Sequence, residues 1–450
     1  MIKNPSGRWR RLAVAGIAMT ALLAACGSDD DEASAPPPVA APAPSPAPVA
    51  PPASSLKGAA DVGPPLSTAQ LDAIVAGTTA ATFSNAARCD VQMVDISYAT
   101  VGADGITPVD ASGVVMVPRG VACPGPFPLV AYSRGTDLEK TRALAAPGDE
   151  EAQLVAALVA SQGFMVAATD YLGYARSTWP THPYLHADSE ASANIDALRA
   201  ARDLAAQRSL ALDGRVFVTG YSQGGHASMA THKAIETKHA NEFTLAGAGH
   251  MSGPYNLVGS VQDALGRLPA GDLGSTYYIP FAVTSLQMVY KDIYTTPGQF
   301  FESPYDATIE TLFPGPPGVS LEDLIAEDRL PLLLSSLVTS DFIAAALDPA
   351  SALYRALSLN SPTGFAPKAP TLLCGGSRDP VVRFSNAEAA LAAFQAAGAT
   401  SVALYDVEKE PAYEPLLRDD LIPVDIHAGY HASLVPPLCL LQVTKHFLTL

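Results

Sequence analysis

Short apolar runs alternate with longer amphipathic segments over most of this chain. Runs rich in β-branched and aromatic residues, which predict buried strands, lie at 91–100, 113–118, 128–133, 164–169, 215–219, 245–251, 370–374 and 402–407. Segments with helical spacing of apolar residues lie at 66–76, 149–162, 187–207, 226–238, 386–397 and 434–448. A turn at 103–105 joins the first two strands as a hairpin, and helices separate most of the others. Because helical connections imply parallel neighbours, the sequence predicts an α/β fold with an eight-stranded, mostly parallel sheet and helices on both faces.

The alternation stops between residue 253 and about residue 367. This stretch holds helical apolar runs separated by Pro and Gly, at 279–290, 321–325, 330–337 and 342–347. An independent domain is one interpretation, but the strand pattern resumes afterwards. We therefore predict a helical lid or cap at 256–365, inserted after the sixth strand into a core made of 65–255 and 366–450.

The N-terminal segment has the composition of an export signal. Basic side chains are followed by an apolar run at 12–25, which is too short to span a bilayer comfortably, and then by Cys26 and Gly27. Residues 1–25 resemble a bacterial lipoprotein signal, which implies lipidation of Cys26 and an exported, lipid-anchored protein at the outer membrane, periplasm or cell surface. An ordinary secretory signal cleaved nearby is the alternative. Residues 26–64 are rich in Pro and Ala and predict an extended tether.

Composition narrows the class of protein and of partner. The 450 residues are 48% apolar and 16% charged, which allows a sizeable core. A formal charge of −17 argues against nucleic acid as a partner. The expected membrane partner is the one that the N-terminal anchor would enter.

The cysteines are consistent with export. Four follow Cys26, and four cysteines allow three pairings. An oxidising compartment permits disulfides, although buried free thiols are the alternative. We favour Cys89–Cys123, because an antiparallel hairpin brings the start of its first strand beside the end of its second. We pair Cys374 with Cys439, which would tie the next-to-last strand to the last helix.

Residues 220–225, Gly-Tyr-Ser-Gln-Gly-Gly, stand between a predicted strand and a predicted helix. In this context a Gly-x-Ser-x-Gly turn raises its serine, Ser222, above the sheet edge. The glycines beside it permit a sharp turn. The backbone N–H of Gln223 lies at the helix N-terminus, where it can stabilise an oxyanion. A Gly-rich turn that only links strand to helix is the alternative.

A serine nucleophile needs a base and an orienting acid, which we seek in the order Ser, acid, His. Asp379 follows the next-to-last strand on a tight loop, where a plain Asp-Pro turn former is the alternative. His431 lies on a predicted loop before the last helix, and His427 is the second candidate for the base. These two histidines could also hold zinc, but the sequence shows no convincing third ligand, so we predict no metal.

The second oxyanion donor should come from the loop after the third strand. Gly135 permits a close backbone approach there, and the N–H of Thr136 is our candidate; an ordinary turn at the strand end is the alternative. Asp170 ends the fourth strand at the same edge and should help to shape the site. Its place in the chain, before Ser222, makes it an unsuitable triad acid.

With Ser222, Asp379 and His431 in this order, residues 85–255 and 365–450 resemble the α/β-hydrolase family. The 133–136 loop, the 170–173 turn, the 220–225 motif and the insertion resemble its secretory-lipase branch, although Arg134 stands where His commonly precedes the glycine. That resemblance implies hydrolysis of carboxylic esters, often lipids, without a cofactor. We therefore expect a serine esterase or lipase that works through an acyl-enzyme. The alternatives are a serine peptidase of the prolyl-oligopeptidase type and a catalytically silent binding lipoprotein on the same scaffold.

Overall fold

The computed structural model describes residues 55–268, 274–316, 319, 321–417 and 427–450, with the side chains of 321, 322, 427 and 428 left undescribed. The export signal, the lipidation candidate Cys26 and most of the predicted tether lie outside these residues. None of the helices in the described part of the chain has the length and apolar character that crossing a membrane requires.

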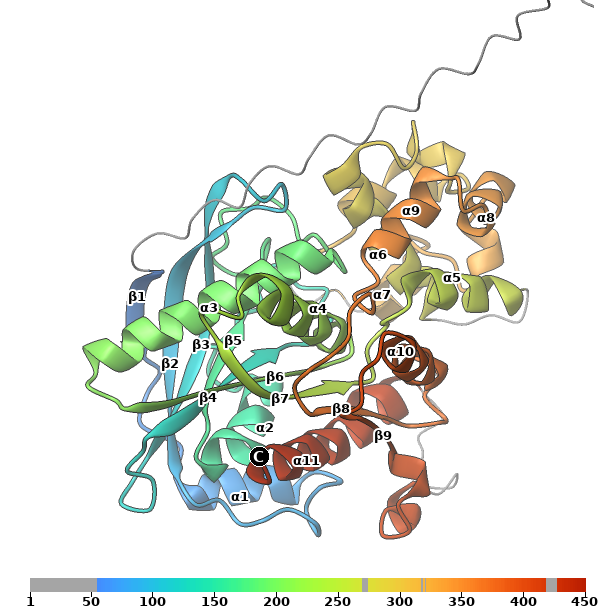
Figure 1. The fold of residues 1–450 in the computed structure, drawn as a ribbon. Coiled ribbons are helices and arrows are strands. Elements are labelled where there is room, and N and C mark those ends of the chain that lie inside the picture. Colours follow the sequence, from blue (N-terminus) through green and yellow to red (C-terminus); the bar gives the residue numbers. More distant parts are fainter. Residues whose placement is uncertain (1–54, 269–273, 317–318, 320, 418–426) are drawn as a thin grey trace, which may run out of the picture. The chain divides into compact units, whose positions relative to one another are not determined.

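One nine-stranded sheet forms the centre of the fold (Figure 1). Its strands are β1 (Leu56–Asp61), β2 (Asp90–Val101), β3 (Pro108–Arg119), β4 (Phe127–Ser133), β5 (Met165–Thr169), β6 (Leu212–Tyr221), β7 (Thr244–Met251), β8 (Thr371–Gly375) and β9 (Val402–Asp406). Their order is β1-β2-β3-β5-β4-β6-β7-β8-β9. The pairings from β1 to β5 along this order are antiparallel, and those from β5 through β4 to β9 are parallel. The predicted mixed α/β class is confirmed.

The predicted strand number was wrong by one. Strand β1 lies inside the segment predicted as an extended tether, and it pairs antiparallel with the edge of β2. This pairing supplies hydrogen bonds to a stretch that has no apolar alternation of its own, because only Ser55 and Leu56 of this stretch turn inward. An edge strand of this kind is stabilised by its neighbour rather than by its own sequence.

Helices cover both faces of the sheet (Figure 1). They are α1 (Thr68–Ala76), α2 (Glu150–Leu158), α3 (Ala187–Gln207), α4 (Gln223–Lys238), α10 (Ser385–Ala396) and α11 (Val435–Leu448). Strand β4 shows how alternate residues serve the two sides. Val130 and Tyr132 pack in the cluster that contains residues of α1, α2 and α11, whereas Leu129 and Ala131 pack with α3 and α4.

Between β7 and β8 the chain forms a helical insertion with its own apolar cluster. Its helices are α5 (Leu257–Gly266), α6 (Ser275–Tyr290), α7 (Leu321–Ala326), α8 (Ser340–Leu347) and α9 (Ala352–Leu359). The sequence anticipated α6, α7 and α8 but not α5 or α9. The predicted helix at 330–337 is wrong. This run forms bends followed by one short 3-10 turn, Leu334–Ser336. The backbone N–H of Leu257 donates to Ser361 Oγ at 3.0 Å, so the two ends of the insertion meet.

Both favoured cysteine pairs form disulfides in the structure. The Cα atoms are 5.8 Å apart in Cys89–Cys123 and 5.7 Å apart in Cys374–Cys439. The first closes the open end of the β2–β3 hairpin, where Asp90 at the start of β2 pairs with Arg119 at the end of β3. The second joins strand β8, which precedes the Asp379 loop, to helix α11, which follows the segment of His431.

Candidate active site

Ser222 lies at the sharp turn between β6 and α4, with φ 59° and ψ −122°. A positive φ is costly for a residue with a side chain, and such strain collects at functional sites. The turn also needs glycine for close packing. A Cβ on Gly224 would lie 1.8 Å from the carbonyl oxygen of Ser133, and one on Gly220 would lie 2.2 Å from the carbonyl oxygen of Gly224. The expected requirement for glycine on both sides of the serine is confirmed.

Three predicted residues come together at the end of the sheet. His431 Nε2 lies 2.8 Å from Ser222 Oγ, and His431 Nδ1 lies 2.7 Å from Asp379 Oδ2. Because a carboxylate only accepts, Nδ1 carries the ring proton and Nε2 is left to accept from the serine hydroxyl. The side chains are nearly enclosed, with exposed fractions of 9% for Ser222, 4% for His431 and 2% for Asp379.

The loop after β8 fixes the Asp379 carboxylate. Its Oδ1 accepts the backbone N–H groups of Val381 at 2.9 Å and Val382 at 3.0 Å. The other oxygen, Oδ2, therefore points to the histidine. Asp379 does form the turn that its Asp-Pro sequence suggests, and the same turn orients the carboxylate.

His431 lies in a π-helix, His427–Leu434, that leads directly into α11. The predicted loop was wrong here, because the helical path begins before α11. Tyr221 supports this segment from below: its hydroxyl donates to the carbonyl oxygen of His431 at 2.7 Å. The side chain of the second candidate, His427, lies outside the described residues. Across the described part of the chain, no group of three or more His, Cys, Asp or Glu side chains is placed to hold a metal ion.

Two backbone N–H groups beside the serine lack partners within the described residues. They belong to Gln223, at the start of α4, and to Thr136, on the loop after β4. The neighbouring Gly135 N–H is already taken, since it donates to Glu151 Oε1 at 2.9 Å. The Thr136 hydroxyl bonds the hydroxyl of Tyr184 at 2.9 Å. The N–H groups of Gln223 and Thr136, the donors that the sequence suggested, therefore remain available among the described residues.

A cluster of charged side chains holds the Thr136 loop. Arg142 forms ion pairs with Glu151 at 2.9 Å, Asp137 at 2.6 Å and Asp149 at 2.9 Å. Burial lowers the pKa of Arg142, but the three carboxylates outweigh burial and raise it above its ordinary value. The cluster thus fixes Gly135 through Glu151 and fixes Asp137 directly. These residues were not anticipated, since charged residues in a loop and a first helical turn look like an ordinary surface.

Arg134 lies fully buried beneath the same loop. Its guanidinium stacks over the ring of Tyr174 at 4.2 Å and donates to the carbonyl oxygen of Asp170 at 3.4 Å. The hydroxyl of Tyr171 donates to the carbonyl oxygen of Arg134 at 3.0 Å. The Asp170 carboxylate accepts from Ser112 Oγ at 2.6 Å, and burial raises its pKa. Arg134 and Asp170 therefore support the loop, as expected for Asp170.

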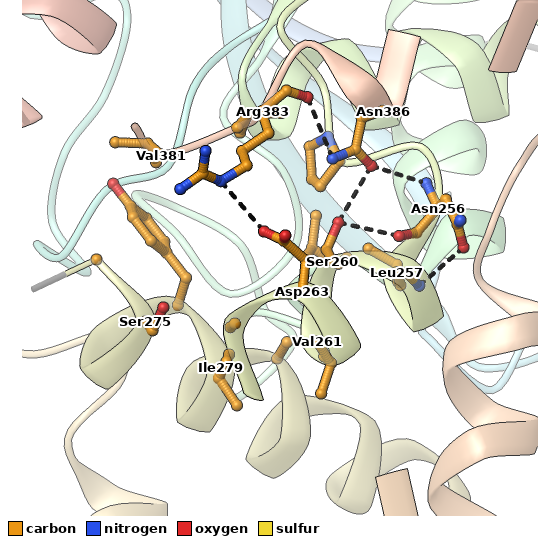
Figure 2. A pocket seen from close by; sticks show the side chains of 18 of the residues that line it. Asn256, Leu257, Ser260, Val261, Asp263, Ser275, Ile279, Val381, Arg383 and Asn386 are labelled. Carbon is orange, nitrogen blue, oxygen red and sulfur yellow. Dashed lines mark hydrogen bonds and ion pairs between the residues drawn. The ribbon is translucent and has the colours of Figure 1, made fainter. Parts of the chain in front are cut away.

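A cavity of about 300 Å³ borders Ser222, between the insertion and the loop before α10. Apolar side chains of α5 and α6 line it, among them Leu257, Val261 and Ile279. Figure 2 shows one charged pair in its wall, in which Arg383 Nε lies 3.2 Å from Asp263. The cavity can therefore accept one apolar group beside the serine.

Comparison with known proteins yields one family model and several similar structures. The family model, described as secretory lipase, matches residues 144–296. The rice cell wall degrading esterase LipA from Xanthomonas oryzae is 34% identical with a TM-score of 0.77, and the match covers 88% of this chain and 98% of that one. No curated protein matches the chain by sequence.

More distant structures share the fold. A Legionella pneumophila protein is 22% identical with a TM-score of 0.73, covering 88% of this chain and 98% of that one. Candida antarctica lipase A is 19% identical with a TM-score of 0.54, covering 78% of this chain and 76% of that one. At these identities the likeness concerns the arrangement of the sheet and its helices. The family model and the LipA match show that this chain belongs to the secretory lipase family of α/β-hydrolases and is a carboxylesterase or lipase.

Proposed function

We propose that this protein is an exported serine carboxylesterase or lipase whose reaction passes through an acyl-enzyme on Ser222. The observation that carries the proposal is the unbroken hydrogen-bond chain from Asp379 through His431 to Ser222, with separations of 2.7 and 2.8 Å. A serine hydroxyl is a weak nucleophile until a base removes its proton, and this chain supplies both the base and the group that orients it.

In the first half of the reaction, Ser222 Oγ attacks the ester carbonyl while His431 Nε2 takes the hydroxyl proton. Asp379 holds Nδ1–H and stabilises the imidazolium that forms. The proton then passes to the leaving alcohol. In the second half, a water molecule attacks the acyl carbonyl and gives its proton to His431. The bond between the acyl group and Ser222 Oγ then breaks, and His431 passes the proton to Oγ, which releases the acid and restores the serine.

The negative charge on the carbonyl oxygen needs donors during both attacks. The N–H groups of Gln223 and Thr136 suit this role because neither has a partner within the described residues, and the end of β4 that leads to Thr136 packs against the turn of Ser222. The Gln223 N–H also lies at the N-terminus of α4, where the helix dipole favours negative charge. We propose these two groups as the oxyanion hole.

The substrate should carry one apolar arm that enters the cavity beside Ser222, with α5 and α6 acting as a lid over it. A volume of about 300 Å³ is at the small end of ligand pockets, so we expect activity to peak at short and medium acyl chains. Because a relative at 34% identity degrades rice cell walls, cell-wall material is a sensible polymeric substrate to include.

We also propose export and lipid anchoring at Cys26. Two disulfides within the fold suit an oxidising compartment outside the cytoplasm. Labelling of cells with a radioactive fatty acid tests the anchor: the wild-type chain should take up label, and Cys26→Ser should not. Equal labelling of both chains would contradict the assignment of Cys26.

The catalytic proposal is tested with p-nitrophenyl esters from C2 to C16, beside aminoacyl-anilides. We expect ester hydrolysis, and a fall in kcat on the order of 10³–10⁶-fold in Ser222→Ala. Labelling of the wild type, but not the variant, by a fluorophosphonate would identify the nucleophile directly. Full ester hydrolysis by Ser222→Ala would refute the assignment of Ser222, and cleavage of anilides alone would favour a peptidase.

A further inference from the structure

Behind Gln223 lies a buried network of polar side chains that the proposed reaction does not use. Glu190, in the first turn of α3, sits at its centre with an exposed fraction of 1%. One carboxylate oxygen accepts from Gln223 Nε2 at 2.8 Å, and the other lies 2.6 Å from His226 Nδ1. A buried carboxylate is costly unless it is paired with a charge, so a cationic partner is expected beside Glu190.

The protonation state of His226 follows from its two neighbours. Its Nδ1 faces the Glu190 carboxylate, and its Nε2 lies 2.6 Å from the backbone carbonyl oxygen of Asn360. A carboxylate and a carbonyl can only accept, so both ring nitrogens must donate. With Glu190 ionised, this geometry makes His226 an imidazolium, and the two side chains form a buried pair.

A second histidine completes the network in its neutral form. His182 Nδ1 donates to the carbonyl oxygen of Leu172 at 2.9 Å, which leaves Nε2 to accept from Gln223 Nε2 at 2.6 Å. Burial lowers the pKa of His182 to about 3, and burial likewise lowers that of the adjacent His186 to about 4. The positive charge that balances Glu190 is thus on His226.

These contacts connect the network to the helical insertion. Asn360, whose carbonyl accepts from His226, ends α9 and also accepts the first N–H of α3 through its side chain at 2.9 Å. The carbonyl oxygen of His182 accepts from Ser285 Oγ of α6 at 3.2 Å. The start of α4 is therefore tied to two helices of the insertion.

Helix α3, which carries Glu190, also contacts the segment that leads to the other proposed oxyanion donor. Asn194 follows Glu190 by one helical turn, and its Oδ1 accepts from Ser133 Oγ at 3.1 Å. Ser133 is the last residue of β4, three residues before Thr136. Two residues of α3 thus hold the two segments that carry the proposed oxyanion donors.

We infer that Glu190 and the His226 imidazolium are positioning residues, which hold the Gln223 N–H in line with the developing oxyanion and make that alignment depend on the seated insertion. This inference rests on the proposed oxyanion hole. The pair touches no substrate. It acts through Gln223, whose side chain it anchors from behind.

The test compares an ester with the matching thionoester, in which sulfur replaces the carbonyl oxygen. Sulfur is a poor hydrogen-bond acceptor, so the thionoester gains little from an oxyanion hole. We expect Glu190→Gln to lower kcat on the ester by about 10- to 100-fold, with KM little changed, because a displaced donor costs less than a deleted one. The thionoester rate should change by less than about 3-fold if the hole alone is affected. Gln223→Met, which keeps the backbone N–H but loses the anchor, should behave in the same way.

A matched control lies further along α4. Glu236 pairs with the buried ring of His232 at 3.0 Å, so Glu236→Gln removes a similar carboxylate from a similar pair away from the serine. We expect this variant to keep the wild-type ratio of ester to thionoester rates. Equal losses on both substrates in Glu190→Gln, or an unchanged ester kcat, would overturn the inference even when Ser222→Ala is inactive. Activity of Ser222→Ala would instead refute the proposed function.

A second measurement examines the wild-type protein itself. Nitrogen-15 NMR of the histidine side chains in the wild-type protein reports whether each ring nitrogen carries a proton, with His226→Gln used for assignment. We expect both nitrogens of His226 to be protonated at pH 7.5, where solvent-exposed histidines are mostly neutral. A neutral ring at His226 would overturn the inference.

Discussion

Replacing Gly224 with alanine should damage the oxyanion hole without touching any polar group. A methyl carbon at this position would lie 1.8 Å from the oxygen and 2.6 Å from the carbon of the Ser133 carbonyl. Both atoms belong to the backbone of β4, so no flexible side chain can yield. Since real Cβ atoms essentially never approach closer than 3.0 Å, α4 and the end of β4 must part by about 1.2 Å.

That separation acts on the two segments that carry the N–H groups of Gln223 and Thr136. A misplacement of about 1 Å can cost about 10²-fold in rate, so we expect kcat to fall by at least about 100-fold. Overpacking should also lower the free energy of unfolding by about 1–3 kcal/mol. Ester kinetics and urea unfolding measure the two effects, and titration with a fluorophosphonate gives the fraction of folded, reactive enzyme.

Gly77→Ala is the matched control. Gly77 ends α1 with φ −83°, and a Cβ there would meet its nearest atom, the carbonyl oxygen of Ile74, at 3.5 Å. This contact is ordinary, so kcat should remain at the wild-type value. A Gly224→Ala enzyme that folds and keeps its kcat within about 2-fold would show that this close approach does not govern the alignment of the donors.

Three further predictions concern the acid, a disulfide and a buried histidine. Asp379→Asn should lower kcat by about 10⁴-fold with little change in melting temperature, because the wrong tautomer of His431 is then favoured; a loss below 10-fold on p-nitrophenyl butyrate would contradict the role of Asp379. Replacing Cys374 and Cys439 together by alanine opens a 65-residue loop and should lower the free energy of unfolding by about 4 kcal/mol in urea; an unchanged midpoint would argue against this loop-closure model. Burial lowers the pKa of His182 to about 3, against about 6.5 when unfolded, so the unfolded chain binds more protons between these values. Stability should therefore fall as pH drops from 6.5 toward 3, by up to about 1.4 kcal/mol per pH unit from this group, and His182→Gln should show a shallower fall; identical slopes would refute the argument.

Local patterns predicted the elements that carry their own signal. The run at 215–219 alternates into both faces of the sheet, so it was found as part of β6. In contrast, β1 depends on the edge of β2 for its hydrogen bonds, and α5 and α9 are short helices that gain their stability from the apolar cluster of the insertion. A pattern confined to a few residues cannot report contacts made by distant parts of the chain.

The candidate site likewise contains residues that a local motif reveals and residues that only the folded structure reveals. Ser222 was found from its motif, and Asp379 and His431 from their order and their places after strands. Glu190 and His226 could not be found in this way, because a Glu and a His on helices ordinarily face solvent. Their burial depends on the packing of α3 against α4, which brings residues 36 positions apart into contact.

The hydrogen bond between Leu257 and Ser361 affects how the insertion of this enzyme can evolve. When the ends of an inserted segment meet, its length and content can vary while the chain on either side keeps its path. The entropic penalty of a longer loop grows only with the logarithm of its length. Recombination at this junction could therefore exchange the helices over the cavity as one segment and give a new choice of ester, provided that the new segment restores the contacts of Ser285 and Asn360 with the network behind Gln223.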